Sequence, residues 1–97
     1  MATFVILLNW TDQGIKGVKE STSRADAAQE LMGSLGIQLR EIYWTLGPYD
    51  VVSIAEAPDD ESMTAAMLKL GSLGNVRSTT LRAFDRGEFD GILAKSG

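Results

Sequence analysis

The 97-residue sequence predicts an α+β fold in which strands and helices follow the order β-α-β-β-α-β. Two strand-like runs, 39–46 and 51–57, flank a Gly47-Pro48 step near the middle of the chain. Because glycine tolerates a positive φ and proline fixes its own φ, this step predicts a tight hairpin turn. Before the hairpin, a strand-like run is followed by apolar residues at helical spacing. After the hairpin, apolar residues at helical spacing are followed by another strand-like run. The order is that of a ferredoxin-like domain with a four-stranded antiparallel sheet.

The first strand is predicted over the apolar run 4–8, which is rich in strand-forming residues. A continuous apolar run of this length is typical of a strand that is buried on both faces. The polar residues 11–14 end it. For residues 15–20 the pattern leaves two alternatives open, a loop or a single helical turn.

The first helix is predicted over residues 22–35. Ser23 and Asp26 resemble a capping box at its start, and Gly36 suits the position that follows its end. Apolar residues recur at helical spacing and predict the buried side, whereas Arg24 is expected to face away from it. The predicted buried stripe consists of Ala25, Ala28, Leu31, Met32 and Leu35.

The second strand is predicted over 37–46 and the third over 49–57. Strict alternation along the second strand divides its side chains between the two faces of the sheet. One face receives Arg40, Ile42, Trp44 and Leu46, and the other receives Leu39, Glu41, Tyr43 and Thr45.

The second helix begins after Pro58, where three acidic residues, 59–61, favour the positive end of the helix dipole. Its predicted buried stripe is Met63, Ala66, Met67 and Leu70. The fourth strand is predicted over 75–84. We therefore expect one domain over residues 1–84, followed by a C-terminal tail, 85–97, with a short helical signal.

Two helices cover only one face of a four-stranded sheet. The other face would carry Val52 and Ile54 beside an apolar first strand, and so it is not plainly polar. An apolar face of several hundred Å² is unusual on a monomer. A second copy packed sheet to sheet would cover it, which predicts a homodimer or higher oligomer of the dimeric α+β barrel type.

The composition excludes several classes of partner. Acidic residues outnumber basic ones by 13 to 9, so the net charge is −4, and neither nucleic acid nor an anionic membrane is expected to bind. The chain has no cysteine and no histidine, and we expect neither a metal site nor a cofactor. No segment approaches the roughly 20 apolar residues of a membrane span, and the run 4–8 lacks the features of a signal peptide. A cytoplasmic location is therefore expected.

Several motifs in order resemble the GYD-domain family. They are Trp10-Thr11-Asp12-Gln13-Gly14-Ile15-Lys16, Leu46-Gly47-Pro48-Tyr49-Asp50, Glu56-Ala57-Pro58-Asp59-Asp60, Leu70-Gly71-Ser72-Leu73-Gly74-Asn75-Val76-Arg77 and Thr79-Thr80-Leu81-Arg82-Ala83-Phe84. The resemblance covers roughly residues 3–84. Pro48, next to Gly47, and Ser21-Thr22, where relatives often have Ser-Pro, depart from the family pattern. The resemblance implies a small bacterial or archaeal protein with a dimeric α+β barrel fold and no established activity.

Two sets of polar residues have both a functional and a structural interpretation. Asp50 and Tyr49 could act as a base and a proton donor at the mouth of a pocket, or they could fix the turn. Arg77 and Arg82 could each bind a carboxylate ligand, or they could pair with an acid such as Glu56.

Asn9, Trp10 and Trp44 supply an amide and aromatic surface near strand ends. They could hold a small molecule, or they could belong to a core or a dimer contact. Two function hypotheses follow. The chain is a binding or structural module that assembles with itself, or it is a cofactor-independent enzyme, of a monooxygenase or isomerase type, that acts on a small and partly aromatic substrate. A ligand pocket between the helices and the sheet would then be lined by Trp10, Trp44, Tyr49 and Arg82.

Overall fold

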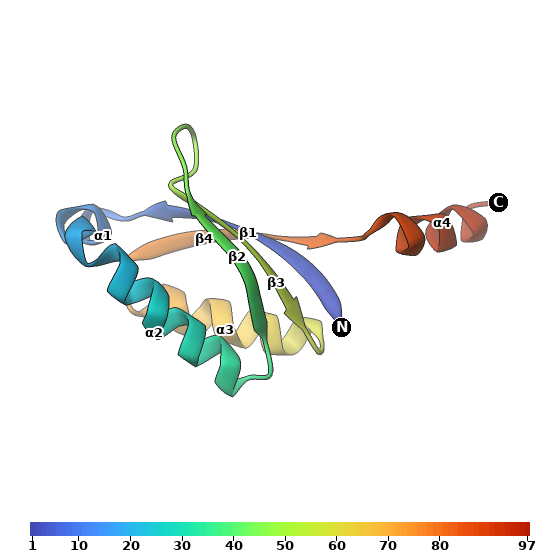
Figure 1. The fold of residues 1–97 in the computed structure, drawn as a ribbon, viewed down its shortest axis with the longest axis horizontal. Helices are drawn as coiled ribbons and strands as arrows, with labels where there is room; N and C mark the ends of the chain where they lie inside the picture. The colour runs from blue at the N-terminus through green and yellow to red at the C-terminus, as the bar shows by residue number, and fades with distance from the viewer.

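The computed structural model describes residues 1–97 as one four-stranded antiparallel sheet with two long helices on one face (Figure 1). The strands lie in the order β2-β3-β1-β4. This topology confirms the predicted α+β, ferredoxin-like arrangement. The elements are β1 Ala2–Trp10, α1 Asp12–Lys16, the 3₁₀-helix η1 Val18–Glu20, α2 Ser21–Ser34, β2 Gln38–Trp44, β3 Val51–Ala57, α3 Asp60–Ser72, β4 Val76–Ala83 and α4 Arg86–Lys95.

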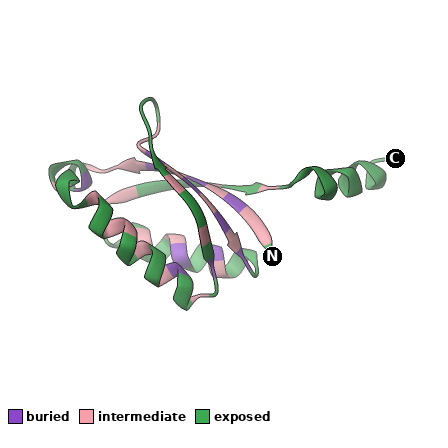
Figure 2. Ribbon diagram, viewed as in Figure 1, coloured by how far each residue is buried: buried purple, intermediate pink, exposed green.

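The core lies between the sheet and the helices α2 and α3. Alternate residues of β1 and β3 face these helices, and Ile6 and Met63 are the largest side chains that are almost completely buried, at 1% and 2% exposure. Figure 2 shows the buried residues gathered in this layer. The buried apolar cluster comprises Phe4, Ile6, Leu8, Met32, Ile37, Val51, Ala55, Ala57, Met63 and Ala66. The helix stripes predicted from periodicity contribute to this cluster.

The alternation predicted for β2 is wrong at its start, because the register shifts between Leu39 and Glu41. A β-bulge places an extra residue in one strand, and so the residues before it change face. Leu39 consequently lies on the helix side with Ile42 and Trp44, and Arg40 binds Glu56 instead, with a distance of 2.6 Å between Nη2 and Oε2.

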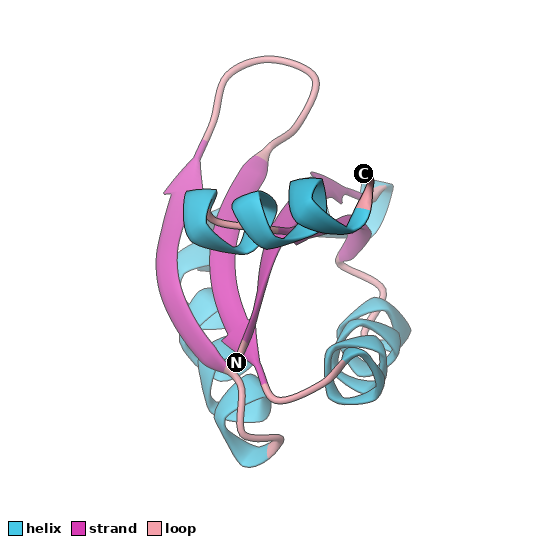
Figure 3. Ribbon diagram, turned by 90° about the vertical axis from the view of Figure 1, so that its right-hand side faces the viewer, coloured by secondary structure: helices cyan, strands magenta, loops and turns pink.

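The central connection is a loop rather than the predicted tight turn. β2 ends at Trp44 and β3 begins at Val51, and residues 45–50 project beyond the sheet as a wide loop (Figure 3). Gly47 has φ of +129°, so the loop does use glycine's conformational freedom. At the base of the loop, Thr45 N donates to Asp50 O over 2.9 Å.

The start of α2 also differs from the prediction. The helix begins at Ser21, and no side chain caps it, so Ser23 and Asp26 lie inside the helix and form no capping box. Residues 15–20, for which the sequence left two alternatives, contribute to the short helix α1 and form η1. Thr11 caps α1, since its side chain accepts a hydrogen bond from Gly14 N.

The acidic start of α3 behaves as predicted. Asp59 is the N-cap, and its Oδ1 accepts a hydrogen bond from Ser62 N over 2.7 Å. This backbone hydrogen bond stabilises the carboxylate and lowers the pKa of Asp59 below its ordinary value. None of the helices combines the length and the apolar character that a membrane span requires.

Candidate functional site

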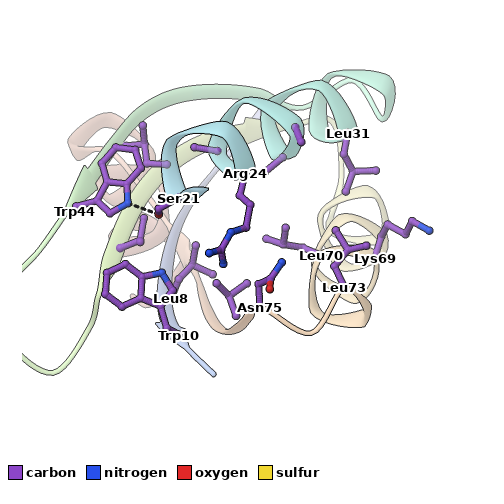
Figure 4. Close-up of a pocket in the computed structure, with 16 residues that line it drawn as sticks. Leu8, Trp10, Ser21, Arg24, Leu31, Trp44, Lys69, Leu70, Leu73 and Asn75 are labelled. Carbon is purple, nitrogen blue, oxygen red and sulfur yellow. Dashed lines mark hydrogen bonds between the residues drawn. The ribbon is translucent and has the colours of Figure 1, made fainter. Parts of the chain in front are cut away.

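A cavity of about 260 Å³ opens between α2, α3 and the helix side of the sheet. Figure 4 shows the side chains that surround it. Most of them are apolar, and both tryptophans of the chain are among them. The lining residues are Leu8, Trp10, Ser21, Arg24, Ala25, Ala27, Ala28, Leu31, Ile42, Trp44, Val51, Lys69, Leu70, Leu73, Asn75 and Val76.

The wall near β2 is held by a hydrogen bond between elements that are far apart in the sequence. Trp44 Nε1 donates to Ser21 Oγ over 2.8 Å, which ties the end of β2 to the first residue of α2 (Figure 4). Trp44 points to this side of the sheet, as the alternation of β2 after its bulge requires. The small side chains of Ala25 and Ala28 on α2 leave the cavity open.

Arg24 reaches from α2 into the space between Trp10 and Asn75 (Figure 4). The prediction that it faces away from the core is therefore wrong. Its Nη2 donates to the carbonyl oxygens of Gly14, over 3.1 Å, and Gly17. These carbonyls lie at the C-terminal end of α1, where the helix dipole favours a cation. The contacts hold the guanidinium in place, and neither Nε nor Nη1 has an acceptor in the chain.

The Asp50 carboxylate serves the structure of the loop rather than the cavity. Its Oδ2 accepts a hydrogen bond from Trp10 N over 2.9 Å, and Asp50 N donates to Leu8 O over 2.8 Å. Asn9 Nδ2 donates to Pro48 O over 2.7 Å and supports the same loop from β1. Neither Asn9 nor Asp50 lines the cavity.

Two further residues predicted to take part in a site lie apart from the cavity. Tyr49 is in the loop, where its carbonyl accepts from Thr45 Oγ1 over 2.6 Å. Arg82 lies toward the other end of β4, over the rings of Phe84 and Phe4 at 4.4 and 5.7 Å from their centroids. Its acidic partner is Glu88, at 3.8 Å, and not Glu56. Of the six residues named from the sequence, the structure brings Trp10 and Trp44 together, and a ligand role for any of them stays a prediction.

The second feature with functional meaning is the sheet face away from α2 and α3, called the open face here. Val5 pairs with Ile54 on one side and Leu81 on the other, and Leu7 pairs with Val52. These five residues form an apolar centre that the rest of the chain covers only in part. Leu81 keeps 47% of its surface exposed. Beside them, Tyr43 donates its hydroxyl to Glu41 Oε2 over 2.8 Å, which raises the pKa of Tyr43 above its ordinary value.

The third feature is α4, which extends away from the sheet and is joined to β4 by the ion pair of Glu88, in its first turn, with Arg82 (Figures 1 and 3). A capping box of Asp85 and Glu88 defines its start. It buries no residue, and Figure 2 shows it exposed along its length. Phe89 and Leu93 keep 50% and 52% of their surfaces exposed, at a spacing that puts them on one side of the helix.

Comparisons with known proteins agree with this architecture. The family model described as the GYD domain matches residues 4–93. A protein of Thermus thermophilus, named "Glutamine synthetase and cystathionine beta-lyase binding protein", is 38% identical over 84 residues, which cover 86% of this chain and 88% of the relative.

Two solved structures share the fold. The crystal structure of TTHA0845 from Thermus thermophilus matches with a TM-score of 0.57 and 29% identity, and the match covers 88% of this chain and 95% of that one. The crystal structure of FFRP-DM1 matches with a TM-score of 0.58, over 87% of this chain and 100% of that one. At 19% identity, the second likeness concerns the fold alone.

Proposed function

The chain belongs to the GYD domain family, and from this premise we propose that it is a binding protein without catalysis of its own, which works as a homodimer. The single observation that carries the proposal is the open face, whose apolar centre is only partly covered by the chain. Water-exposed apolar patches of this kind mark interaction surfaces. A copy of the same chain offers a self-complementary partner about a two-fold axis.

The size of the open face supports this assignment. Four strands of about seven residues cover roughly 450 Å², from the ordinary spacings of strands and residues in a sheet. Two such faces, together with the side chains that stand on them, approach the lower end of the roughly 1,200–2,000 Å² typical of stable interfaces. Aligned packing would produce the dimeric α+β barrel expected from the sequence.

The exposed helix α4 gives independent support. A ten-residue helix is only marginally stable in water without packing, yet α4 buries none of its residues within its own chain. Its apolar side, with Phe89 and Leu93, would gain burial against a second copy. We therefore include α4 in the dimer interface, where it would enlarge the area that the sheet faces bury.

The lining of the cavity favours binding over proton-transfer chemistry. General acid-base catalysis requires a titratable group at the reacting atom. Asp50 and Tyr49, the pair that could have supplied it, lie outside the cavity, and no aspartate, glutamate or tyrosine is among the lining residues. The lysine of the lining, Lys69, extends away from the cavity (Figure 4). The cofactor-independent enzyme is therefore the weaker of the two hypotheses.

The relative's printed name supports a protein partner. We propose that this chain, like that relative, docks onto an enzyme, and that glutamine synthetase and cystathionine β-lyase are the first two candidates to test. Loop 45–50 offers a contact, because Leu46 at this projecting loop is fully exposed. Because all of its apolar surface is in contact with water, covering this leucine with a partner would contribute the most binding free energy that a leucine can give.

We predict that the purified chain, immobilised for biolayer interferometry, binds at least one of these two enzymes purified from the same organism. Leu46→Ser should weaken that binding at least about fivefold, because it removes apolar surface that the partner would cover. Leu68→Ser is the matched control, since Leu68 is also exposed, at 70%, but lies on α3. Failure of both enzymes to bind would overturn the partner proposal, and equal losses in the two variants would overturn the role of the loop.

A further inference from the structure

We propose that the cavity between α2, α3 and the sheet is a binding site for a small amphipathic carboxylate, with its apolar part against the two tryptophans and its carboxylate on Arg24. This site lies on the opposite side of the sheet from the open face, so it is independent of the proposed dimer interface.

The volume of the cavity limits the size of its ligand. A cavity of about 150 Å³ is known to hold a benzene molecule, and drug-sized ligands occupy roughly 300 Å³ or more. At about 260 Å³, this cavity has room for one aromatic ring with a short chain, or for a chain of about eight carbons. Its walls, largely Leu, Ile, Val, Ala and Trp side chains, favour an apolar body.

The charge of the lining determines which polar group the ligand should carry. Acidic residues outnumber basic ones by 13 to 9 in the whole chain, yet the charged residues of the lining are Arg24 and Lys69, both cationic. Neither of them forms an ion pair within the chain. Lys69 extends away from the cavity in Figure 4, so Arg24 is the cation that a ligand inside would meet.

The hydrogen-bonding groups that remain free around Arg24 are mainly donors. Arg24 Nε and Nη1, Trp10 Nε1 and Asn75 Nδ2 have no acceptor in the chain. The two side-chain acceptors among these residues each already receive a hydrogen bond within the chain, since Asn75 Oδ1 accepts from Gln13 and Ser21 Oγ accepts from Trp44. A ligand that fits this set must supply acceptor atoms, and a carboxylate presents two oxygens in the geometry that a guanidinium prefers.

The preorganised position of Arg24 strengthens this assignment. The carbonyls of Gly14 and Gly17 hold Nη2, so the guanidinium does not have to be ordered when a ligand binds. The contact at Nη2 fixes the direction of the other N–H groups of Arg24, and no carboxylate of the protein binds them. A ligand carboxylate would therefore take the place that an aspartate or glutamate takes in an ordinary ion pair.

Intrinsic fluorescence tests the proposal directly, because the only two tryptophans of the chain line the cavity. We expect sodium octanoate to shift the tryptophan emission in a saturable titration. Octanamide, which has the same chain but no charge, should bind at least about tenfold more weakly. Arg24→Gln should reduce octanoate affinity by about the same factor and leave octanamide affinity unchanged.

A second pair of variants keeps the test decisive if Arg24→Gln does not fold. Ala28→Met fills the cavity from α2 and should abolish binding of both probes, whereas Ala65→Met makes the same change on the exposed side of α3 and should bind both normally. The proposal is overturned if octanamide binds wild-type protein as well as octanoate does, or if Ala28→Met titrates like Ala65→Met. Neither result would bear on the dimer, which is measured by mass.

Discussion

Val5→Lys is expected to convert the dimer into a folded monomer, with a rise of at least about 100-fold in the dimer Kd. Val5 lies at the centre of the open face, paired with Ile54 and Leu81, and none of these three residues is acidic. In a sheet-to-sheet dimer, the ammonium would be taken out of water, and Glu56, two residues along the neighbouring strand on the same face, is already paired with Arg40. In the monomer it remains hydrated, so circular dichroism should show a folded protein. Light scattering after size-exclusion chromatography gives the mass.

Leu68→Lys is the matched control for this variant. It makes the same apolar-to-lysine change at an exposed position of α3, on the opposite side of the sheet from the open face. We expect it to keep the mass of the unmodified protein. A folded Val5→Lys protein with unchanged mass would show that the open face is not the interface, even if the protein is an oligomer.

Gly14→Ala is expected to destabilise the fold by about 3 kcal/mol or more and to lower Tm by more than about 10 °C. A Cβ atom at Gly14 would lie 1.9 Å from the carbonyl oxygen of Asn75. That oxygen already accepts a hydrogen bond from Thr11 N over 3.1 Å, so the backbone cannot move without losing this contact. Urea denaturation followed by circular dichroism measures the change.

Gly33→Ala separates this steric effect from the general effect of replacing a glycine. A Cβ atom at Gly33 meets nothing within 4 Å, and the residue lies inside α2. Alanine there should stabilise the protein by up to about 1 kcal/mol, from helix propensity alone. Equal stabilities for Gly14→Ala and Gly33→Ala would refute the close packing of α1 against the 74–75 turn.

The topology could be predicted because each element carries a periodic pattern that does not depend on distant contacts. The stripe of Met63, Ala66, Met67 and Leu70 follows the helical period, and the two faces of β4 follow strict alternation. The apolar residues on both faces of β1 likewise indicated that the sheet needs cover on each side. That cover comes from the helices on one side, and on the other it is proposed to come from a second copy.

The errors in β2 and in the loop have a common cause, which is that contacts between residues, rather than the local sequence pattern, decide both features. A bulge adds one residue without changing the composition of the strand, so alternation alone cannot reveal that Leu39 and Arg40 exchange faces. The side chain of Glu56, from the neighbouring strand, then holds Arg40. The Gly47-Pro48 step marks a reversal, but backbone contacts of Thr45 and Asp50, rather than the step itself, set the width of the loop.

The candidate site could be predicted only in part. Aromatic residues near strand ends indicate Trp10 and Trp44, and the fold does place both at one cavity. The sequence does not indicate Arg24, because its charge suggests a solvated helix face. The signal that could identify it is the pair Gly14 and Gly17, ten and seven residues earlier, whose carbonyls lie at the C-terminal end of a short helix, where the helix dipole favours a cation.

The most direct test of the proposed assembly is the mass of the unmodified protein by sedimentation equilibrium. Measurements should span concentrations from about 1 to 100 µM, so that a weak dimer is distinguished from a stable one. We predict a mass of about 21 kDa, twice the 10.5 kDa of one chain, in the upper part of this range. A mass of 10.5 kDa at every concentration would contradict self-association through the open face.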